Sequence, residues 1–203
     1  MDNLLPVRLT LVSASPRRHE LLAKLDLPFD VVPSSADELT TAASGRELSI
    51  LNARLKVERS SCAEDRSRVL IGADTVVALD GRFFGKAEDA DDARRILQEL
   101  SGQTHDVITG VCISGPAPGP DLSFVRVEFA DVSRVQFHDL TDDIIESYLR
   151  SGEWEGKAGA YAIQGAGGRL VSGLEGDLDN VIGLPTTLIN DLLRSHFGHC
   201  RFL

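Results

Sequence analysis

Arg17 and Arg18 close the segment Ser13-Ala-Ser-Pro-Arg-Arg18, at a point in the chain where cations are unusual. Ser15 is a favourable N-cap and Pro16 suits the first helical position, so both arginines fall in the first turn of a predicted helix. Unpaired backbone N–H groups already give that end of a helix partial positive charge. A helix N-terminus with two added guanidinium groups has the chemistry of a phosphate receptor. The alternative is a solvated first turn whose arginines contact surface carboxylates.

Asp74 interrupts the most apolar run of the chain, residues 69–79. A carboxylate within an apolar strand costs several kcal/mol, about 3–5, unless it is paired or binds a metal. In one interpretation, Asp74 lies at a strand end or at a bulge, and Gly72 would permit such a bend. In the other, Asp74 is a general base or a metal ligand held on a rigid strand. We favour the catalytic interpretation, because the flanking apolar residues offer no partner that would stabilise a charge without a function.

Other polar residues have local sequences that leave their roles open. Lys86 follows a Phe-Phe-Gly segment, and Lys56 lies in a predicted helix; each has the pattern of an ordinary solvated lysine. Glu38, like Asp37 before it, follows a Pro-Ser-Ser loop and is either an N-cap or a metal ligand. The amide of Gln164 has a donor and an acceptor, so it could read a nucleobase edge or satisfy backbone groups in the core.

The elements that must position these residues alternate between strand and helix patterns, which predicts an α/β fold. Strand patterns cover residues 7–12, 29–32, 69–79, 105–114 and 124–137, and helical patterns cover residues 16–25, 47–59, 89–100, 142–149 and 186–193. Asp80-Gly81 predicts a hairpin turn, and residues 115–120 predict a loop between two strands. On the helix at 47–59, the apolar spacing predicts that Leu48, Leu51 and Leu55 face inward, with Ile50 as a further candidate.

The composition is that of a folded protein with an acidic surface. The chain has 203 residues, 42% of them hydrophobic, enough to bury one large core or two smaller lobes. A formal net charge of −10 argues against partners such as nucleic acid or an anionic membrane, so a local group of cations must be held against the overall charge.

Location is predicted from what the sequence lacks. No apolar run reaches membrane-spanning length, and the first residues do not resemble a secretory signal. The three widely spaced cysteines fit neither a disulfide framework nor a zinc motif. We therefore expect a cytoplasmic protein.

Ordered motifs along nearly the whole chain resemble the Maf-like nucleotide pyrophosphatases. They are Ser13-Ala-Ser-Pro-Arg-Arg18, Gly72-Ala-Asp-Thr75, Gly85-Lys86, Ser101-Gly-Gln-Thr-His105 with Thr109-Gly110, Lys157-Ala-Gly-Ala-Tyr161, Ile163-Gln-Gly165 and Asn180-Val-Ile-Gly-Leu-Pro185. The resemblance implies hydrolysis of a nucleoside triphosphate to the monophosphate and pyrophosphate, with a divalent cation such as Mg²⁺ or Mn²⁺. It also implies an elongated mixed β-sheet flanked by helices, a single domain of two lobes around a central cleft, and a homodimer.

The resemblance also assigns roles to residues. Asp74 is the expected catalytic residue, and Glu38 and Asp74 are the expected metal ligands. The expected substrate-binding residues are Ser13, Arg17, Arg18, Lys56, Thr75, Lys86 and Gln164, of which Arg17, Thr75 and Gln164 are expected to set specificity.

Two features favour the branch of the family that resembles enzymes for thymidine and uridine triphosphates. Thr75 follows Asp74, and Ile163-Gln-Gly165 comes later, where the branch that prefers 7-methylguanosine triphosphate has glutamine and a Ser-Glu-Gly-like segment. A neutral amide can pair with uracil or thymine, whereas a carboxylate suits the cationic 7-methylguanine better. Methylguanine specificity and a non-catalytic nucleotide-binding regulator of cell division are the alternatives.

Overall fold

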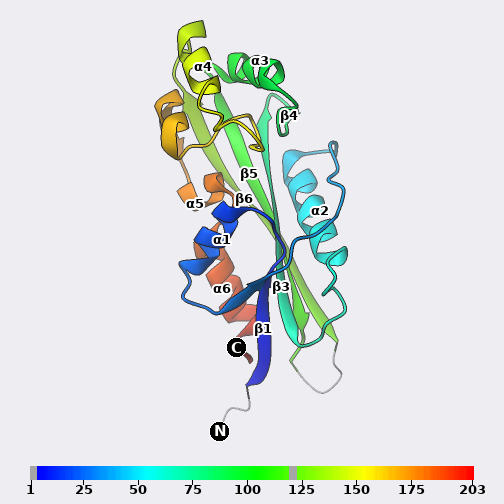
Figure 1. Cartoon of the computed structure of the whole chain (residues 1–203). Helices are drawn as coiled ribbons and strands as arrows, with labels where there is room; N and C mark the ends of the chain where they lie inside the picture. The colour runs from blue at the N-terminus through cyan, green and yellow to red at the C-terminus, as the bar shows by residue number, and fades with distance from the viewer. Residues whose placement is uncertain (1–3, 119–122) are drawn as a thin grey trace.

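Three long strands form the spine of the protein, as the computed structural model of residues 4–118 and 123–203 describes it (Figure 1). The strands are β1 (Leu5–Leu11), β2 (Phe29–Val31), β3 (Arg68–Leu79), β4 (Arg82–Phe84), β5 (Thr104–Pro116), β6 (Phe124–Phe137), β7 (Val171–Glu175) and β8 (Cys200–Phe202). The helices are α1 (Pro16–Ala23), α2 (Gly45–Glu58), α3 (Ala90–Leu100), α4 (Asp142–Leu149), the 3₁₀ helix η1 (Gly165–Leu170), α5 (Leu178–Ile182) and α6 (Thr186–Phe197).

Within these residues the strands form one mixed sheet in the order β2-β1-β3-β5-β6-β7, with β4 paired to β3 and β8 paired to β1. Strand β1 runs parallel to β2, β3 and β8, whereas β3, β5, β6 and β7 follow one another with each neighbouring pair antiparallel. The sheet and its flanking helices confirm the predicted mixed α/β fold, and Figure 1 shows its elongated shape.

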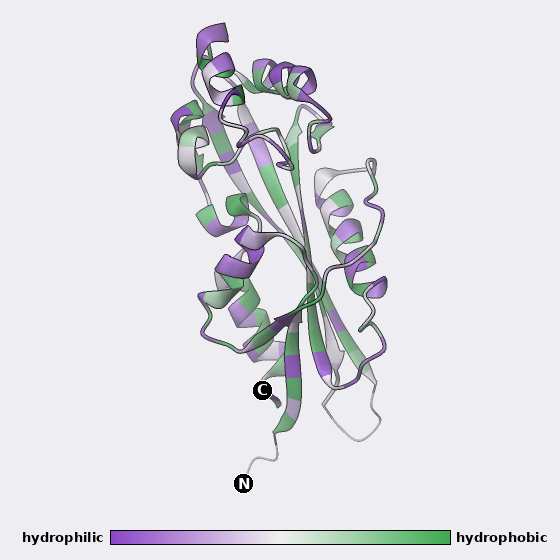
Figure 2. Ribbon diagram, in the orientation of Figure 1, coloured by the Kyte–Doolittle hydropathy of each residue, from purple (hydrophilic) through white to green (hydrophobic). Residues whose placement is uncertain are grey.

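Two hydrophobic cores lie at opposite ends of the long strands. One packs α1 and α6 against β1 and the adjoining halves of β3 and β5, through residues such as Leu9, Leu22, Ile71 and Phe197. The other packs α3 and α4 against the remaining halves of β3 and β5, through residues such as Leu97, Leu100, Ile145 and Phe137. Figure 2 shows hydrophobic and hydrophilic residues alternating along α3, as expected for a helix with one apolar face. A third, smaller cluster packs α2 against the sheet through Val12, Ala53, Val57, Leu70 and Cys112.

Local turn and cap signals predicted several elements correctly. Asp80 and Gly81 both have positive φ, 50° and 77°, and join β3 to β4 as a hairpin. The side chains of Asp89 and Thr141 accept hydrogen bonds from backbone N–H groups at the starts of α3 and α4. Among the described residues, no helix has the length and apolar character needed to cross a membrane.

Other predictions differ from the structure. β5 continues to Pro116, so the predicted loop at residues 115–120 begins later, and residues 119–120 lie outside the described residues. The glycine-rich segment between α4 and α6 contains η1, β7 and α5, which local sequence patterns did not reveal. β8 was not predicted either, because three residues are too few to show a hydrophobic alternation. It forms by pairing with β1.

The buried face of α2 was predicted incorrectly. Leu48 is buried as expected, but Leu51 and Leu55 are only partly buried. The fully buried residues of the helix include Ser49, Asn52, Ala53 and Lys56, most of which are small or polar. The leucine spacing gave the wrong face because α2 packs closely on the sheet through small side chains. The same face directs polar side chains toward β3.

An opening in the sheet lies beside the middle of β3. β1 pairs with β3 only as far as Ile71, and β4 pairs with it only from Val77. Among the described residues, no strand pairs with the edge of β3 between these two points, although the other edge of β3 is paired with β5 there. The loop after β1 leads to α1 and the segment after β2 leads to α2, on opposite sides of the sheet (Figure 1). Such a divergence of loops beyond the carboxyl ends of parallel strands creates a crevice.

Candidate active site

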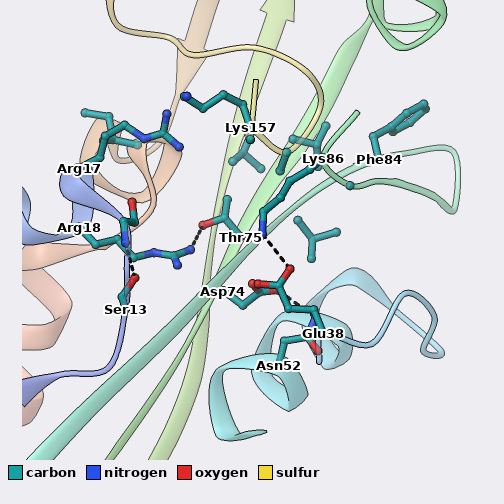
Figure 3. Close-up of a pocket in the computed structure, with 18 of the residues that line it drawn as sticks. Ser13, Arg17, Arg18, Glu38, Asn52, Asp74, Thr75, Phe84, Lys86 and Lys157 are labelled. Carbon is teal, nitrogen blue, oxygen red and sulfur yellow. Dashed lines mark hydrogen bonds and ion pairs between the residues drawn. The ribbon is translucent and has the colours of Figure 1, made fainter. Parts of the chain in front are cut away.

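A cavity of about 820 Å³ opens at this unpaired edge of β3. The charged side chains that line it are five basic ones and two acidic ones: Arg17, Arg18, Lys56, Lys86, Lys157, Glu38 and Asp74. In a chain of net charge −10, this local excess of cations makes the cavity suited to an anion. The arginine pair and Asp74 therefore face a common cavity (Figure 3).

The N-terminus of α1 has backbone groups available for a ligand. Ser15 is the N-cap with extended backbone, but its side chain accepts no cap hydrogen bond, and no acidic residue lies in the first turn. Pro16 takes the first helical position, as predicted. Ser13 is buried, and its Oγ accepts a hydrogen bond from the Ser15 N–H at 3.2 Å, which leaves the Ser13 hydroxyl proton free to donate.

The two arginines have different surroundings. The Nε of Arg18 donates to the carbonyl of Gly183 at 2.8 Å, and one Nη donates to Oγ1 of Thr75 at 3.0 Å. Burial lowers the pKa of Arg18, while Asp74 and Glu38 act in the opposite direction. In the described part of the chain, Arg17 has no carboxylate partner, and its Nε is buried without a hydrogen bond. Arg17 is therefore the cation with the greater capacity to bind an incoming anion.

Thr75 belongs to a hydrogen-bonded chain in which its hydroxyl proton is already donated. Thr109 donates to the backbone carbonyl of Asn180 at 2.9 Å, so the hydroxyl of Thr109 must accept from Thr75, 3.0 Å away. Thr75 in turn accepts from Arg18. A hydroxyl has one proton to donate, and Thr75 donates it to Thr109. Among the cavity's cations, Thr75 therefore bonds directly to Arg18 (Figure 3).

Asp74 lies on the other face of β3, where α2 supplies donors to both of its oxygens. Lys56 Nζ is 2.6 Å from Oδ1, and Asn52 Nδ2 is 3.0 Å from Oδ2. Asn52 and Lys56 are four residues apart and so share one face of the helix. Only 7% of Asp74 is exposed, and the ammonium and amide groups compensate for the burial of its charge.

Glu38 joins the same cluster from the segment between β2 and α2. Its Oε1 lies 2.7 Å from Lys56 Nζ, and its Oε2 lies 3.0 Å from Lys86 Nζ. Burial acts to raise the pKa of Glu38, but the ammonium groups of Lys56 and Lys86 outweigh it and lower that pKa to about 2. Lys56, which is 9% exposed, also donates to the carbonyl of Ala73, so its three protons face protein acceptors.

Two glycines allow α2 to approach the sheet closely enough for these contacts. A Cβ at Gly72 would lie 2.5 Å from the backbone oxygen of Ala53. A Cβ at Gly110, which faces Asp74 across the β3–β5 pair, would lie 2.2 Å from the backbone carbon of Ser49. Real Cβ contacts are never that short, so the absence of side chains at both positions sets the distance between helix and sheet.

Another wall of the cavity comes from the segment that follows β4 and the segment that contains Lys157. Lys86 pairs with Ala158 in an isolated antiparallel bridge, and the N–H of Gly159 donates to the carbonyls of Phe84 and Gly85. This pairing fixes the Lys86 loop against the segment that carries Lys157. Gln164 lines the cavity, is exposed, and has no hydrogen bond from its amide to other described residues.

Every residue predicted from the sequence to bind, select or transform the substrate lines this cavity: Ser13, Arg17, Arg18, Glu38, Lys56, Asp74, Thr75, Lys86 and Gln164. Asn52 and Lys157 line it as well, and neither is among the predicted residues. The available signal for Asn52 was its position four residues before Lys56, on a helix whose polar residues were assumed to face solvent.

Glu38 and Asp74 also offer the oxygen donors that a divalent cation prefers. Both carboxylates contact one cation, the Lys56 ammonium, so they converge on a single position. Within residues 4–118 and 123–203, no group of three or more histidine, cysteine, aspartate or glutamate side chains is placed to hold a metal. Two carboxylates are fewer ligands than a divalent cation needs, so phosphate oxygens and water would have to complete the coordination of a bound Mg²⁺ or Mn²⁺.

Comparison with known proteins agrees with these motifs. The model of a family described as Maf-like protein matches residues 8–196. A dTTP/UTP pyrophosphatase of Moorella thermoacetica is 43% identical over 92% of this chain and 93% of its own length. A dTTP/UTP pyrophosphatase of Pyrococcus furiosus is 37% identical over 95% of this chain and 96% of its own length. The Staphylococcus aureus Ham1 protein, a solved structure, matches with a TM-score of 0.41 and 17% identity over 65% of this chain and 72% of that one.

The family match extends over nearly the whole chain, and it includes the arginine segment, the strand of Asp74 and the residues of the opposite wall. The cavity, the motifs that line it and these relatives lead to one conclusion: the chain belongs to the family of Maf-like proteins.

Proposed function

We propose that this protein hydrolyses nucleoside triphosphates to the monophosphate and pyrophosphate, with dTTP and UTP as its preferred substrates. One observation carries the proposal: an anion-binding helix end with a free arginine lines the same cavity as the buried carboxylate of Asp74 and the more exposed carboxylate of Glu38. The relatives named dTTP/UTP pyrophosphatase, which match over nearly their full length, support the choice of substrate.

The triphosphate would lie along the basic side of the cavity. Arg17, Lys86 and Lys157 line it, and the free N–H groups at the start of α1 and the Ser13 hydroxyl can donate to phosphate oxygens. Arg18 adds positive charge while it stays bonded to Thr75. Substrate oxygens would also compete with Glu38 for Lys56 and Lys86, since these ion pairs lie in the cavity.

Glu38 and Asp74 would hold a divalent metal, which neutralises phosphate charge and polarises the α-phosphate when bound. Asp74 would accept a proton from water as the water oxygen bonds to the α-phosphorus. The bond from that phosphorus to the bridging oxygen breaks, and pyrophosphate leaves with the bonding electrons. A carboxylate has about four lone-pair positions, so Asp74 can act on water while Lys56 and Asn52 hold it.

Selection of the base is proposed for the exposed end of the cavity. Gln164 lines it with an amide that has no partner among the described residues, so both its donor and its acceptor can meet a pyrimidine edge. Thr75 would contribute through Arg18, because its hydroxyl is already used within the protein. Arg17 would set specificity by fixing where the phosphates lie relative to the base.

The direct test is pyrophosphate release by the purified protein across a nucleotide panel, with Mg²⁺ or Mn²⁺. The panel contains dTTP, UTP, the remaining common triphosphates and 7-methyl-GTP. We expect dTTP and UTP to give the highest kcat/KM. A preference for 7-methyl-GTP would assign the other branch, and tight binding with no pyrophosphate released from any nucleotide would assign a non-catalytic regulator.

Further properties are proposed from the acidic composition, the sequence patterns and the family resemblance. We propose a cytoplasmic homodimer that binds neither nucleic acid nor membranes. Light scattering coupled to size-exclusion chromatography measures the oligomeric state, and a measured mass near 22 kDa would exclude the dimer. Cell fractionation and gel-shift assays check the location and the absence of nucleic-acid binding.

A further inference from the structure

Asn52 has a buried side-chain amide beside Asp74, and both polar atoms of that amide form hydrogen bonds. It is 3% exposed. Its Nδ2 donates one hydrogen to Asp74 Oδ2 at 3.0 Å and the other to the carbonyl of Leu39 at 3.0 Å. Its Oδ1 accepts the N–H of Leu39 at 2.7 Å. A side-chain amide with all these bonds formed is fixed in a single orientation.

The partners of Asn52 determine which way its amide must face. A backbone N–H can only donate, so the bond from Leu39 requires the oxygen of Asn52 on that side. The NH₂ group is thereby directed to Asp74, which accepts as a carboxylate. The Asn52 side chain thus links the orientation of the Asp74 carboxylate to the backbone of Leu39, the residue after Glu38.

The segment that carries Glu38 depends on this contact for its position. Residues 32–42 contain no helix or strand. In the described part of the chain, the backbone hydrogen bonds that residues 33–42 make to another element are the two between Leu39 and Asn52. Glu38 precedes Leu39 directly, so fixing the Leu39 peptide groups fixes the point from which the Glu38 carboxylate extends.

We infer that Asn52 is a positioning residue that sets the geometry of Glu38 and Asp74 relative to each other. It orients Asp74 by a hydrogen bond from the helix and anchors the Glu38 segment by pairing with the Leu39 backbone. This inference rests on the proposed function, because it assigns the two carboxylates a shared task. Lys56 contacts both carboxylates too, but its flexible point charge imposes less direction than a planar amide.

Two variants separate the two contributions of Asn52. Asn52→Leu is close in size and removes all three bonds. Asn52→Asp keeps an acceptor for the Leu39 N–H but places a second carboxylate against Asp74. Ser49→Ala is the matched control: Ser49 is also buried on α2 and bonds only to the carbonyl of Arg46, outside the cavity.

Steady-state pyrophosphate release and hydrogen exchange of the Leu39 amide are the two measurements. A hydrogen bond to a charged group contributes enough that its loss should lower kcat about 10- to 100-fold. We expect this loss in both Asn52 variants, with KM near the wild-type value. The Leu39 amide should exchange faster in Asn52→Leu and stay protected in Asn52→Asp. Ser49→Ala should keep wild-type kcat and exchange.

The outcomes that overturn the inference are distinct from those that overturn the proposed function. If the wild-type protein releases no pyrophosphate from any nucleotide, the proposed function is wrong, and the shared catalytic task of the carboxylates falls with it. If the wild type is active and both Asn52 variants keep their kcat, or lose activity only through KM, the positioning role alone is wrong. An equal loss in Ser49→Ala would also refute it. If Asn52→Leu does not fold, Asn52→Ser replaces it, because serine is too short to reach both partners.

Discussion

Asp74 and Gly110 face each other across the β3–β5 pair, and the missing side chain at Gly110 is what allows the helix above them to approach Asp74. The helix supplies Asn52 and Lys56, which hold the two carboxylate oxygens. Gly110, which has no side chain, therefore controls how closely α2 and its donors approach the Asp74 carboxylate.

Gly110→Ala should lower both stability and turnover. The added methyl group would lie 2.2 Å from the Ser49 backbone, so α2 must move away from the sheet. Overpacking of this kind costs about 1–3 kcal/mol of unfolding free energy. Chemical denaturation and kcat measure the two effects. Gly173→Ala is the control, since its Cβ would make ordinary contacts of 3.5 Å on β7. Equal stability of the two variants would show that the close approach is unimportant.

Asp74→Asn should abolish turnover while nucleotide binding is retained. The amide preserves the shape of the side chain but cannot accept a proton from water, and loss of a general base lowers kcat by about 10²–10⁴-fold. Pyrophosphate release measures the rate, and calorimetric titration with dTTP measures binding. Asp106→Asn is the control, because Asp106 lies on β5 beside Arg134, is half-buried and does not line the cavity. Full activity of Asp74→Asn would refute the catalytic assignment.

Arg17→Ala and Arg18→Ala should differ in their effect on stability. Arg17 has no carboxylate partner among residues 4–118 and 123–203, so its removal should raise KM and lower kcat together, with kcat/KM falling about 10- to 100-fold. Arg18 bonds to Gly183 and Thr75, so its removal should also lower the unfolding free energy by about 1–3 kcal/mol. An unchanged kcat/KM in Arg17→Ala would remove that residue from the site.

Gln164→Glu should change substrate preference more than total activity. The carboxylate can accept but not donate, so dTTP and UTP should lose kcat/KM disproportionately within the nucleotide panel. Gln103→Glu, an exposed position outside the cavity, controls for the added charge. Equal losses for every nucleotide would indicate that Gln164 has a structural role.

His105 should make stability depend on pH below neutrality. It is 1% exposed, its Nε2 lies 2.9 Å from the hydroxyl of Tyr161, and burial lowers its pKa from 6.5 to about 4. The unfolded chain therefore binds more protons than the folded one between these two values. The contribution of His105 is complete above pH 6.5 and is lost as the pH falls toward 4, by up to about 3 kcal/mol.

Denaturant titrations between pH 7 and pH 4 measure this dependence. His105→Gln should flatten the curve, because the variant has no titrating group at that position. His196→Gln is the control, since His196 is exposed on α6. A pH slope that is the same in His105→Gln and in wild type would assign the dependence to other groups.

The local sequence was sufficient to predict the elements whose ends carry caps and turns. Pro16 begins α1 and Asp80-Gly81 forms a hairpin as predicted, and α3 and α4 begin within one residue of the predicted helical ranges, because these signals act within a few residues. The isolated charge at Asp74 also predicted a partnered carboxylate correctly, since an unpaired charge is too costly in an apolar strand.

The contacts between residues far apart in the sequence were decided only by the tertiary structure. Asn52, Leu39 and Asp74 come from a helix, a segment without regular structure and a strand, and no spacing along the chain predicts their contact. The inward face of α2 was misread for the same reason, because its neighbours Gly72 and Gly110 select small and polar residues over leucines. The division of roles between Arg17 and Arg18 likewise came only from the fold, since adjacent helical residues point in different directions and only one of them meets Gly183 and Thr75.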